Sequence, residues 1–194
     1  VFELLQTMKT MIQGHPEPVQ TLSLGRFAKE TAGMLRALLP RRIQLDIETP
    51  KESDTIAANP DELRQLLLTL CIQAWQAMRP AGGIIKVCVE PSGAARDLSH
   101  QGPASSSGEY VCLHVHDSGP APDQVNGCDP CVPFSSSRRP GDASGLSMFA
   151  ADQLARHLGG TMLIQDDNGE GFAVHVRFPF ALRPEKHAEA TATD

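Results

Sequence analysis

Hydrophobic residues recur at three- and four-residue steps along residues 59–78, which is the most regular helical pattern in the chain. Asn59 is a favourable N-cap and Pro60 suits the first helical position. The apolar stripe consists of Leu63, Leu66, Leu67, Leu70, Ala74, Ala77 and Met78. Pro80 and the Gly82–Gly83 pair interrupt the pattern. The spacing therefore predicts an amphipathic helix over 60–78 with one face in a core.

Strands and helices alternate around this helix. Helical patterns cover residues 24–39, after a Ser23 cap, and 145–158, before Gly159–Gly160, and the first is expected to bury Phe27, Leu35 and Leu38. Strand patterns cover 42–48, 84–89, 110–116, 161–165 and 172–178, the last two joined by a turn at 166–169. A short apolar segment at 56–58 leads into the central helix. The order predicts a two-layer α/β sandwich, a mixed sheet with helices on one face.

Three parts of the chain differ in sequence pattern, which predicts a division into an N-terminal helix with its linker, one domain and a tail. Residues 1–13 carry an apolar seam at nearly heptad spacing, typical of a short helix that pairs outside the domain. We expect residues 1–18 to be the end of a dimerisation helix plus a linker, 19–181 one domain, and 182–194 a disordered tail. Residues 91–108, rich in Ser, Gly and Ala, are expected to form a loop. The first residue, Val1, suggests a piece of a longer protein.

Composition excludes several classes of protein. The formal net charge of −6 disfavours a duplex-binding surface. No apolar run approaches the ~20 residues that a membrane-spanning helix requires. Five cysteines without framework spacing fit a reducing compartment. Cys128 and Cys131 have metal-like or redox-like spacing, but one such pair supplies only half a zinc site, so a metal or redox role stays a minor alternative.

Four short motifs follow one another in a meaningful order. They are the helix with its Arg79-Pro-Ala-Gly-Gly83 ending, Asp117-Ser-Gly119, Val132-Pro-Phe134 with Arg138, and Gly141-Asp-Ala-Ser-Gly145-Leu146. In this order they resemble the ATP-binding domain of sensor histidine kinases, in the ATPase superfamily that includes gyrase and the heat-shock chaperone. The resemblance covers residues 22–180. It implies the histidine-kinase type of α/β sandwich and an ATP and Mg²⁺ site.

The resemblance assigns roles to individual residues. Asp117 would accept a hydrogen bond from the adenine amino group, and Gly119 would let the backbone pass beside the base. Phe134 would fasten the lid over the site, and Arg138 would approach the phosphates. From the residues alone, the alternative for Asp117 is a turn-capping aspartate, and Arg138 equally fits a solvated loop charge.

The remaining roles concern phosphate and metal. Gly141, Gly145 and Leu146 would belong to the phosphate-holding loop and the helix N-terminus that follows it, or else to an ordinary glycine-rich loop. Gln73 stands where the family has an asparagine that binds Mg²⁺ through its amide oxygen. Its alternative is a solvated helix residue.

The chain departs from the family at several of these positions. Gln73 is one methylene longer than asparagine, Ala121 and Ala143 replace glycines, and Asp142 places a carboxylate where triphosphate would lie. At about 1 kcal/mol each, such changes together would remove two or more decades of affinity. The histidines at positions 15, 114, 116 and 175 do not fit a phosphoacceptor helix.

Three functions are consistent with this pattern. The first is the ATP-binding catalytic domain of a two-component sensor histidine kinase, delivering the γ-phosphoryl group to a histidine outside this chain. The second is a degenerate module that binds nucleotide poorly and acts in regulation or docking. The third is a phosphotransfer scaffold that never uses ATP.

The expected partners are the dimerisation and phosphoacceptor domain of the same protein, a response regulator, and a second copy that binds through the N-terminal helix. The expected location is the cytoplasm. The sequence identifies neither the stimulus nor the cognate regulator.

Overall fold

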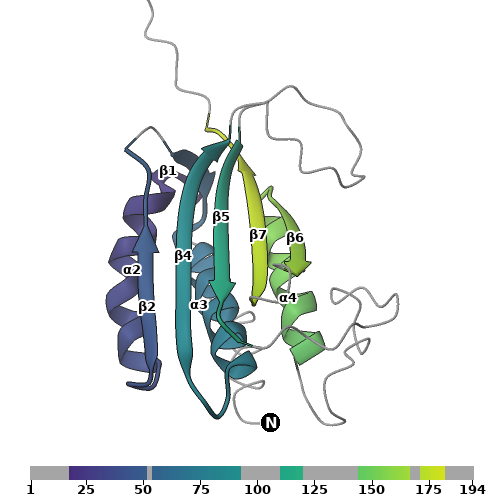
Figure 1. Ribbon diagram of the computed structural model, residues 1–194. Helices are drawn as coiled ribbons and strands as arrows, with labels where there is room; N and C mark the ends of the chain where they lie inside the picture. Colours follow the sequence, from purple (N-terminus) through teal and green to yellow (C-terminus); the bar gives the residue numbers. More distant parts are fainter. Residues whose placement is uncertain (1–17, 52–53, 93–109, 120–143, 167–170, 182–194) are drawn as a thin grey trace, which may run out of the picture.

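The computed structural model describes residues 18–51, 54–92, 110–119, 144–166 and 171–181 (Figure 1). The expected N-terminal helix at 1–13, the disordered tail at 182–194 and the 166–169 turn beyond Asp166 lie outside these ranges. So do Phe134, Arg138, Gly141, the Cys128–Cys131 pair and the substituted positions 121, 142 and 143. The division at residues 18 and 181 stays a prediction.

The main sheet has five strands in the order β2-β4-β5-β7-β6. Its strands are β2 (Ile43–Glu48), β4 (Gly83–Ser92), β5 (Tyr110–Asp117), β6 (Thr161–Asp166) and β7 (Phe172–Pro179). β2 and β4 are parallel, whereas the other three neighbouring pairs are antiparallel. Helices α2 (Leu24–Leu38), α3 (Pro60–Ala77) and α4 (Ser144–His157) lie together behind the sheet in Figure 1. The predicted two-layer sandwich with a mixed sheet is confirmed.

Local capping explains where α3 begins. The side-chain oxygen of Asn59 accepts hydrogen bonds from the backbone N–H groups of Asp61, at 2.9 Å, and Glu62, at 3.2 Å. These bonds satisfy two donors that the first turn of a helix leaves without partners. The leucine stripe then faces the core, with Leu63 and Leu66 fully buried. The chain turns after the helix at Gly82, which has a φ of +90° that favours glycine.

Helix α2 is held at its start by two acceptors. The Ser23 hydroxyl accepts from the Arg26 N–H at 3.2 Å, and a carboxylate oxygen of the buried Asp54 accepts from the Gly25 N–H at 2.5 Å. Leu35 is buried as predicted, but the prediction for Leu38 is wrong, because 56% of this residue is exposed. Leu38 is the last residue of α2. The residues that face the core at this end of the helix are Leu35 and Leu39, which are both buried.

A two-stranded sheet is an element that the sequence patterns did not reveal. β1 (Gln20–Ser23) pairs antiparallel with β3 (Thr55–Ala58), so the short segment at 56–58 is a strand. Ile56 is fully buried and also forms a bridge to Phe180, next to the end of β7. The pairing partner lies more than thirty residues away along the chain, which local periodicity cannot report.

Strand β4 runs further than predicted, through Pro91 to Ser92, where the sequence indicated a loop. Proline has no backbone N–H to donate, so it is disfavoured in a strand that has neighbours on both sides. The register explains its tolerance, because β2 pairs with β4 only as far as Cys88, and beyond that residue only β5 lies alongside. The second half of β4 is thus an edge on the side of β2.

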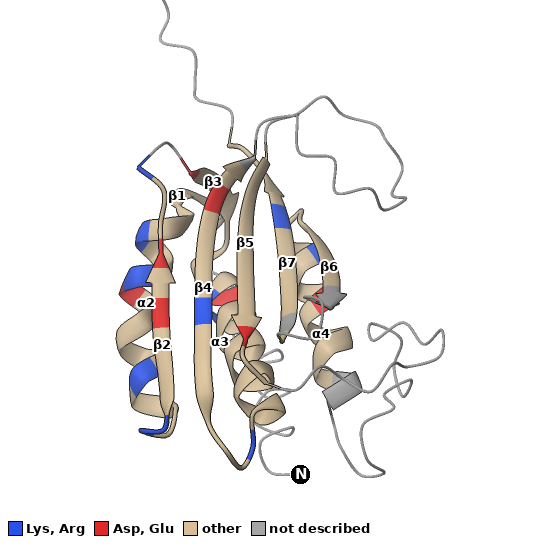
Figure 2. Ribbon diagram, viewed as in Figure 1, with Lys and Arg blue, Asp and Glu red and all other residues tan. Residues whose placement is uncertain are grey.

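The two faces of the sheet differ in character. Val87 and Leu113 on the helix-covered face are buried in the core. The opposite face, toward the viewer in Figure 2, carries charges of both signs on β2 and β4, including the 2.9 Å ion pair between Lys86 and Glu48. Among the helices of the described ranges, none has the length and hydropathy needed to cross a membrane.

Candidate functional site

Asp117 is the best-defined residue of the predicted site. It ends β5, where it lies opposite Ile85 of β4 and Phe172 of β7, and only 2% of it is exposed. Its Oδ1 accepts a hydrogen bond from the Gly119 N–H at 2.9 Å. The carboxylate therefore caps its own turn, as one interpretation of the sequence expected. A carboxylate has several acceptor positions, so one such group can serve more than one donor.

Gly119 packs where a side chain would not fit. A Cβ added there would lie 2.7 Å from the Asp117 Oδ1 and 3.1 Å from the Met78 Cγ. It would also lie 3.4 Å from the backbone carbon of Ala77, in the last turn of α3. The absence of a side chain thus lets the turn that follows β5 lie directly against the C-terminal end of α3.

Ser118, between these two residues, fastens the turn to β4. Its hydroxyl accepts from the Ile84 N–H at 2.9 Å, while its own N–H donates to the Ile84 carbonyl at 3.1 Å. The hydroxyl also lies 3.6 Å from the Met78 sulfur. Sequence reasoning missed this role of Ser118, because serine beside glycine signals a turn without naming its partner.

Gln73 lies one helical turn before Ala77 on α3 and is 7% exposed. The alternative of a solvated helix residue is therefore wrong. Its Nε2 donates to the Gln76 Oε1 over 3.5 Å, a long hydrogen bond. With the amide nitrogen directed to Gln76, the amide oxygen is the atom suited to a hard cation.

A magnesium ion needs few protein ligands when phosphates supply the others. No group of three or more His, Cys, Asp or Glu side chains in the part of the chain that the structure describes could hold a metal ion alone. The donor chemistry at Gln73 fits one neutral oxygen ligand. One such ligand suits an Mg²⁺ ion that is coordinated mainly by phosphate oxygens.

Helix packing places the start of α4 toward the same end of the domain as Gln73. Glu62, in the first turn of α3, lies 3.5 Å from His157, in the last turn of α4, so the two helices run in opposite directions. Gly145 and Leu146, in the first turn of α4, thus lie toward the C-terminal half of α3, which carries Gln73 (Figure 1). The structure brings these positions and Asp117 to one end of the sandwich.

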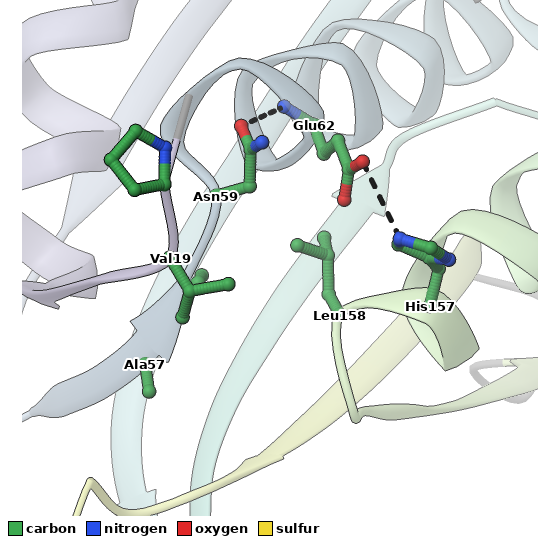
Figure 3. A pocket seen from close by; sticks show the side chains of 8 residues that line it. Val19, Ala57, Asn59, Glu62, His157 and Leu158 are labelled. Carbon is green, nitrogen blue, oxygen red and sulfur yellow. Dashed lines mark hydrogen bonds and ion pairs between the residues drawn. The ribbon is translucent and has the colours of Figure 1, made fainter. Parts of the chain in front are cut away.

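A cavity of about 320 Å³ lies at the other end of α3 (Figure 3). Its polar lining is Asn59, Glu62 and His157, and the apolar part is Pro18, Val19, Ala57, Ala58 and Leu158. No residue predicted to bind nucleotide contributes to it. The Glu62–His157 pair lies at one side, so the cavity lies between the segment that precedes β1 and the elements β3, α3 and α4.

No protein-family model matches this chain. A two-component sensor of Pseudomonas aeruginosa, PprA, is 26% identical over 149 residues, which cover 74% of this chain and 14% of that protein. The chain thus spans about a seventh of its curated relative.

Solved structures give a fuller match. The catalytic domain of the histidine kinase ThkA superimposes with a TM-score of 0.62 at 18% identity, covering 84% of this chain and 96% of that one. A mycobacterial sensor histidine kinase, MprB, gives 0.59 at 17% identity, with coverages of 83% and 97%. AdeS of Acinetobacter baumannii gives 0.61 at 14% identity, with coverages of 92% and 76%. The fold is therefore that of the catalytic domains of histidine kinases.

Proposed function

We propose that this chain is the ATP-binding catalytic domain of a two-component sensor histidine kinase. The observation that supports this most is the buried Asp117 carboxylate, held by the Gly119 N–H in a turn that lies against the end of α3. A buried carboxylate beside a close backbone approach suits recognition of an amino group on a flat base. The likeness to ThkA and MprB in fold, and to PprA in sequence, supports the same assignment.

Each residue would contribute position and charge rather than covalent chemistry. Asp117 and Gly119 would hold the adenine, and Gly145 and Leu146 would present the N-terminus of α4 to phosphate. Gln73 would supply one oxygen to Mg²⁺, and the bound ion would neutralise phosphate charge. The γ-phosphoryl group would pass to a histidine outside this chain, on the dimerisation domain of the same cytoplasmic protein, and then to a response regulator.

A second candidate is a degenerate module that binds nucleotide weakly and serves regulation, docking or phosphotransfer. The supporting observation is the Gln73 amide, which is a methylene longer than the asparagine of the family and is already engaged with Gln76. Under this proposal the adenine end persists while the metal and phosphate end is impaired.

Calorimetric titration separates the two candidates. We expect the chain to bind ADP, and Asp117→Asn to abolish binding, because the amide presents an N–H₂ group where a carboxylate accepts. The matched control is Asp61→Asn, since Asp61 is exposed on the first turn of α3 and should leave binding unchanged. Equal ADP affinity in a folded Asp117→Asn variant would remove Asp117 from the site. Competent catalysis requires tighter binding of an ATP analogue with Mg²⁺ than without it.

A further inference from the structure

Two histidines face each other across the centre of the β5–β7 ladder. His114 and His175 are directly opposite in the register, and their Nδ1 atoms lie 2.5 Å apart. The ring planes are inclined at 76°, with centroids 4.7 Å apart. Each ring nitrogen either donates or accepts, so this contact requires one N–H between the two Nδ1 atoms.

The contact tolerates a limited number of protons. With both rings neutral, or with one protonated, one Nδ1 donates and the other accepts. When both rings are protonated, both Nδ1 atoms carry hydrogen, so two donors and two positive charges face each other. The second protonation therefore breaks the contact.

The surroundings also oppose charge on His114. Burial lowers the pKa of His114, Glu90 on β4 acts in the opposite direction, and Arg177 on β7 lowers this pKa further. The pair thus has one carboxylate and one guanidinium close to it.

The other neighbours of the pair on this face come from β4, β5 and β6. Cys88 of β4 lies opposite His114, and Leu163 of β6 lies opposite His175. Cys112 and His116 are the next residues of β5 on the same side, and Lys86 lies opposite His116. Lys86 is already ion-paired with Glu48 of β2, so it adds little positive potential beside the histidine pair.

The ladder that contains this pair also positions the candidate nucleotide site. Three register steps from His114 and His175, Asp117 pairs with Phe172 at the end of both strands. Gly171, just before Phe172, abuts the backbone oxygen of Asp117. Separation of the strands at the histidines would therefore loosen the support of the Asp117 turn.

We propose that the His114–His175 contact is an acid-sensitive latch, whose second protonation loosens the β5–β7 ladder and so weakens the site at Asp117. The part that concerns nucleotide rests on the proposed function, whereas the part that concerns the ladder does not. The latch is closed at neutral pH and opens as both rings become charged.

The direction of the pH effect follows from proton linkage. A histidine with a folded-state pKa below its unfolded value of about 6.5 binds fewer protons when folded. Stability therefore falls as the pH drops below about 6.5 and is unaffected well above it. One pKa unit of difference corresponds to a tenfold change in the folding equilibrium constant.

The first experiment measures chemical denaturation of the chain at pH 7.5 and pH 5.0. The folding equilibrium constant of the parent should fall between pH 7.5 and pH 5.0. This fall should be at least about tenfold larger than the fall for His175→Gln or His114→Gln. His157→Gln is the control, because His157 is exposed and lies beside Glu62 on other elements. Equal pH dependence in the parent and in both latch variants would overturn the proposal.

Histidine NMR gives a second readout that does not depend on variant stability. The parent should show suppressed second protonation at the coupled pair, and His175→Gln should let His114 titrate as a single group nearer to its ordinary pKa. Two independent, unit-slope titrations in the parent would contradict the latch.

ADP binding at pH 7.5 and 5.5 then tests the link to the site. The parent should lose at least about threefold more affinity than His175→Gln over this interval, and His157→Gln should follow the parent. Protonation of ADP changes the affinity of every protein by the same factor, so it cancels in the comparison between parent and variants. Absence of ADP binding at both pH values would reject the proposed function while the denaturation and NMR results still decide the latch. Equal losses in parent and variant would reject the link to the site.

Discussion

A Cβ atom added to Gly171 would overlap the backbone carbonyl oxygen of Asp117. Gly171 has a φ of +142° and precedes β7, whereas Asp117 ends β5. The two strands thus meet without room for a side chain at the border of the candidate nucleotide site. The contact joins the last pair of the β5–β7 register to the turn that holds Gly119.

Substitution Gly171→Ala should therefore destabilise the domain. The new methyl group overlaps backbone atoms, which cannot rotate away as a side chain can, and the positive φ adds strain of about 1–2 kcal/mol. We expect a loss of about 2 kcal/mol or more in the free energy of unfolding, measured by urea denaturation.

Gly33→Ala is the matched control for this experiment. Gly33 lies in the middle of α2 with nothing within 4 Å of an added Cβ. Alanine is the better helix former by about 0.5–1 kcal/mol, so this variant should gain stability. A Gly171→Ala protein as stable as its parent would mean that β5 and β7 do not approach each other as described.

Restoring the family pattern should strengthen binding of Mg·ATP. The variant combines four substitutions, Gln73→Asn, Ala121→Gly, Asp142→Thr and Ala143→Gly. It shortens the side chain that carries the amide, returns two glycines and removes a carboxylate. At about 1 kcal/mol per position, we expect a gain of tenfold or more in affinity by calorimetry.

The gain should be larger for ATP than for ADP, because two of the four changes stand where the resemblance places the γ-phosphate. ADP titration of the same variant is therefore the internal control. If the parent already binds Mg·ATP as well as the variant does, the degenerate alternative fails and the domain is an ordinary catalytic unit.

Cys71 should resist alkylation in the folded protein. It is fully buried in α3, and burial raises its pKa from 9.0 to about 12. At pH 8 the reactive thiolate is therefore far rarer at Cys71 than at an ordinary thiol. Peptide mass spectrometry after iodoacetamide treatment should show Cys71 unmodified in native buffer.

Denaturant supplies the control for this labelling, because unfolding returns the thiol to its ordinary reactivity. Cys88, with a pKa raised to about 11 mainly by burial, should react more readily than Cys71 in the folded protein. Rapid native labelling of Cys71 would show that α3 does not bury this face.

Local patterns were sufficient for most of the elements. The helix over Pro60–Ala77 was predicted because its cap, its leucine stripe and its terminating glycines lie within one segment. β5 was predicted because Val111, Leu113 and Val115 alternate with polar residues, and all three are buried. The motif that follows β5 also located the turn at Asp117 and Gly119.

Long-range packing decided what local patterns could not. Leu38 has the side chain of a core residue, yet it is exposed, whereas Leu35 and Leu39 on either side of it are buried. Gln73 has the side chain of a surface residue, yet it is buried. Pro91 is accommodated in β4 only because β2 ends alongside Cys88.

The order of the elements, their periodicity and the residue types at the candidate site follow from local sequence alone. Three contacts follow only from the folded arrangement: Ser118 joins Ile84, Gly171 abuts Asp117, and His114 meets His175. Each of these contacts joins strands that are separated along the chain, and their partners follow from register. Register depends on the packing of the whole sheet against its helices, because a shift of one residue would turn every side chain to the other face.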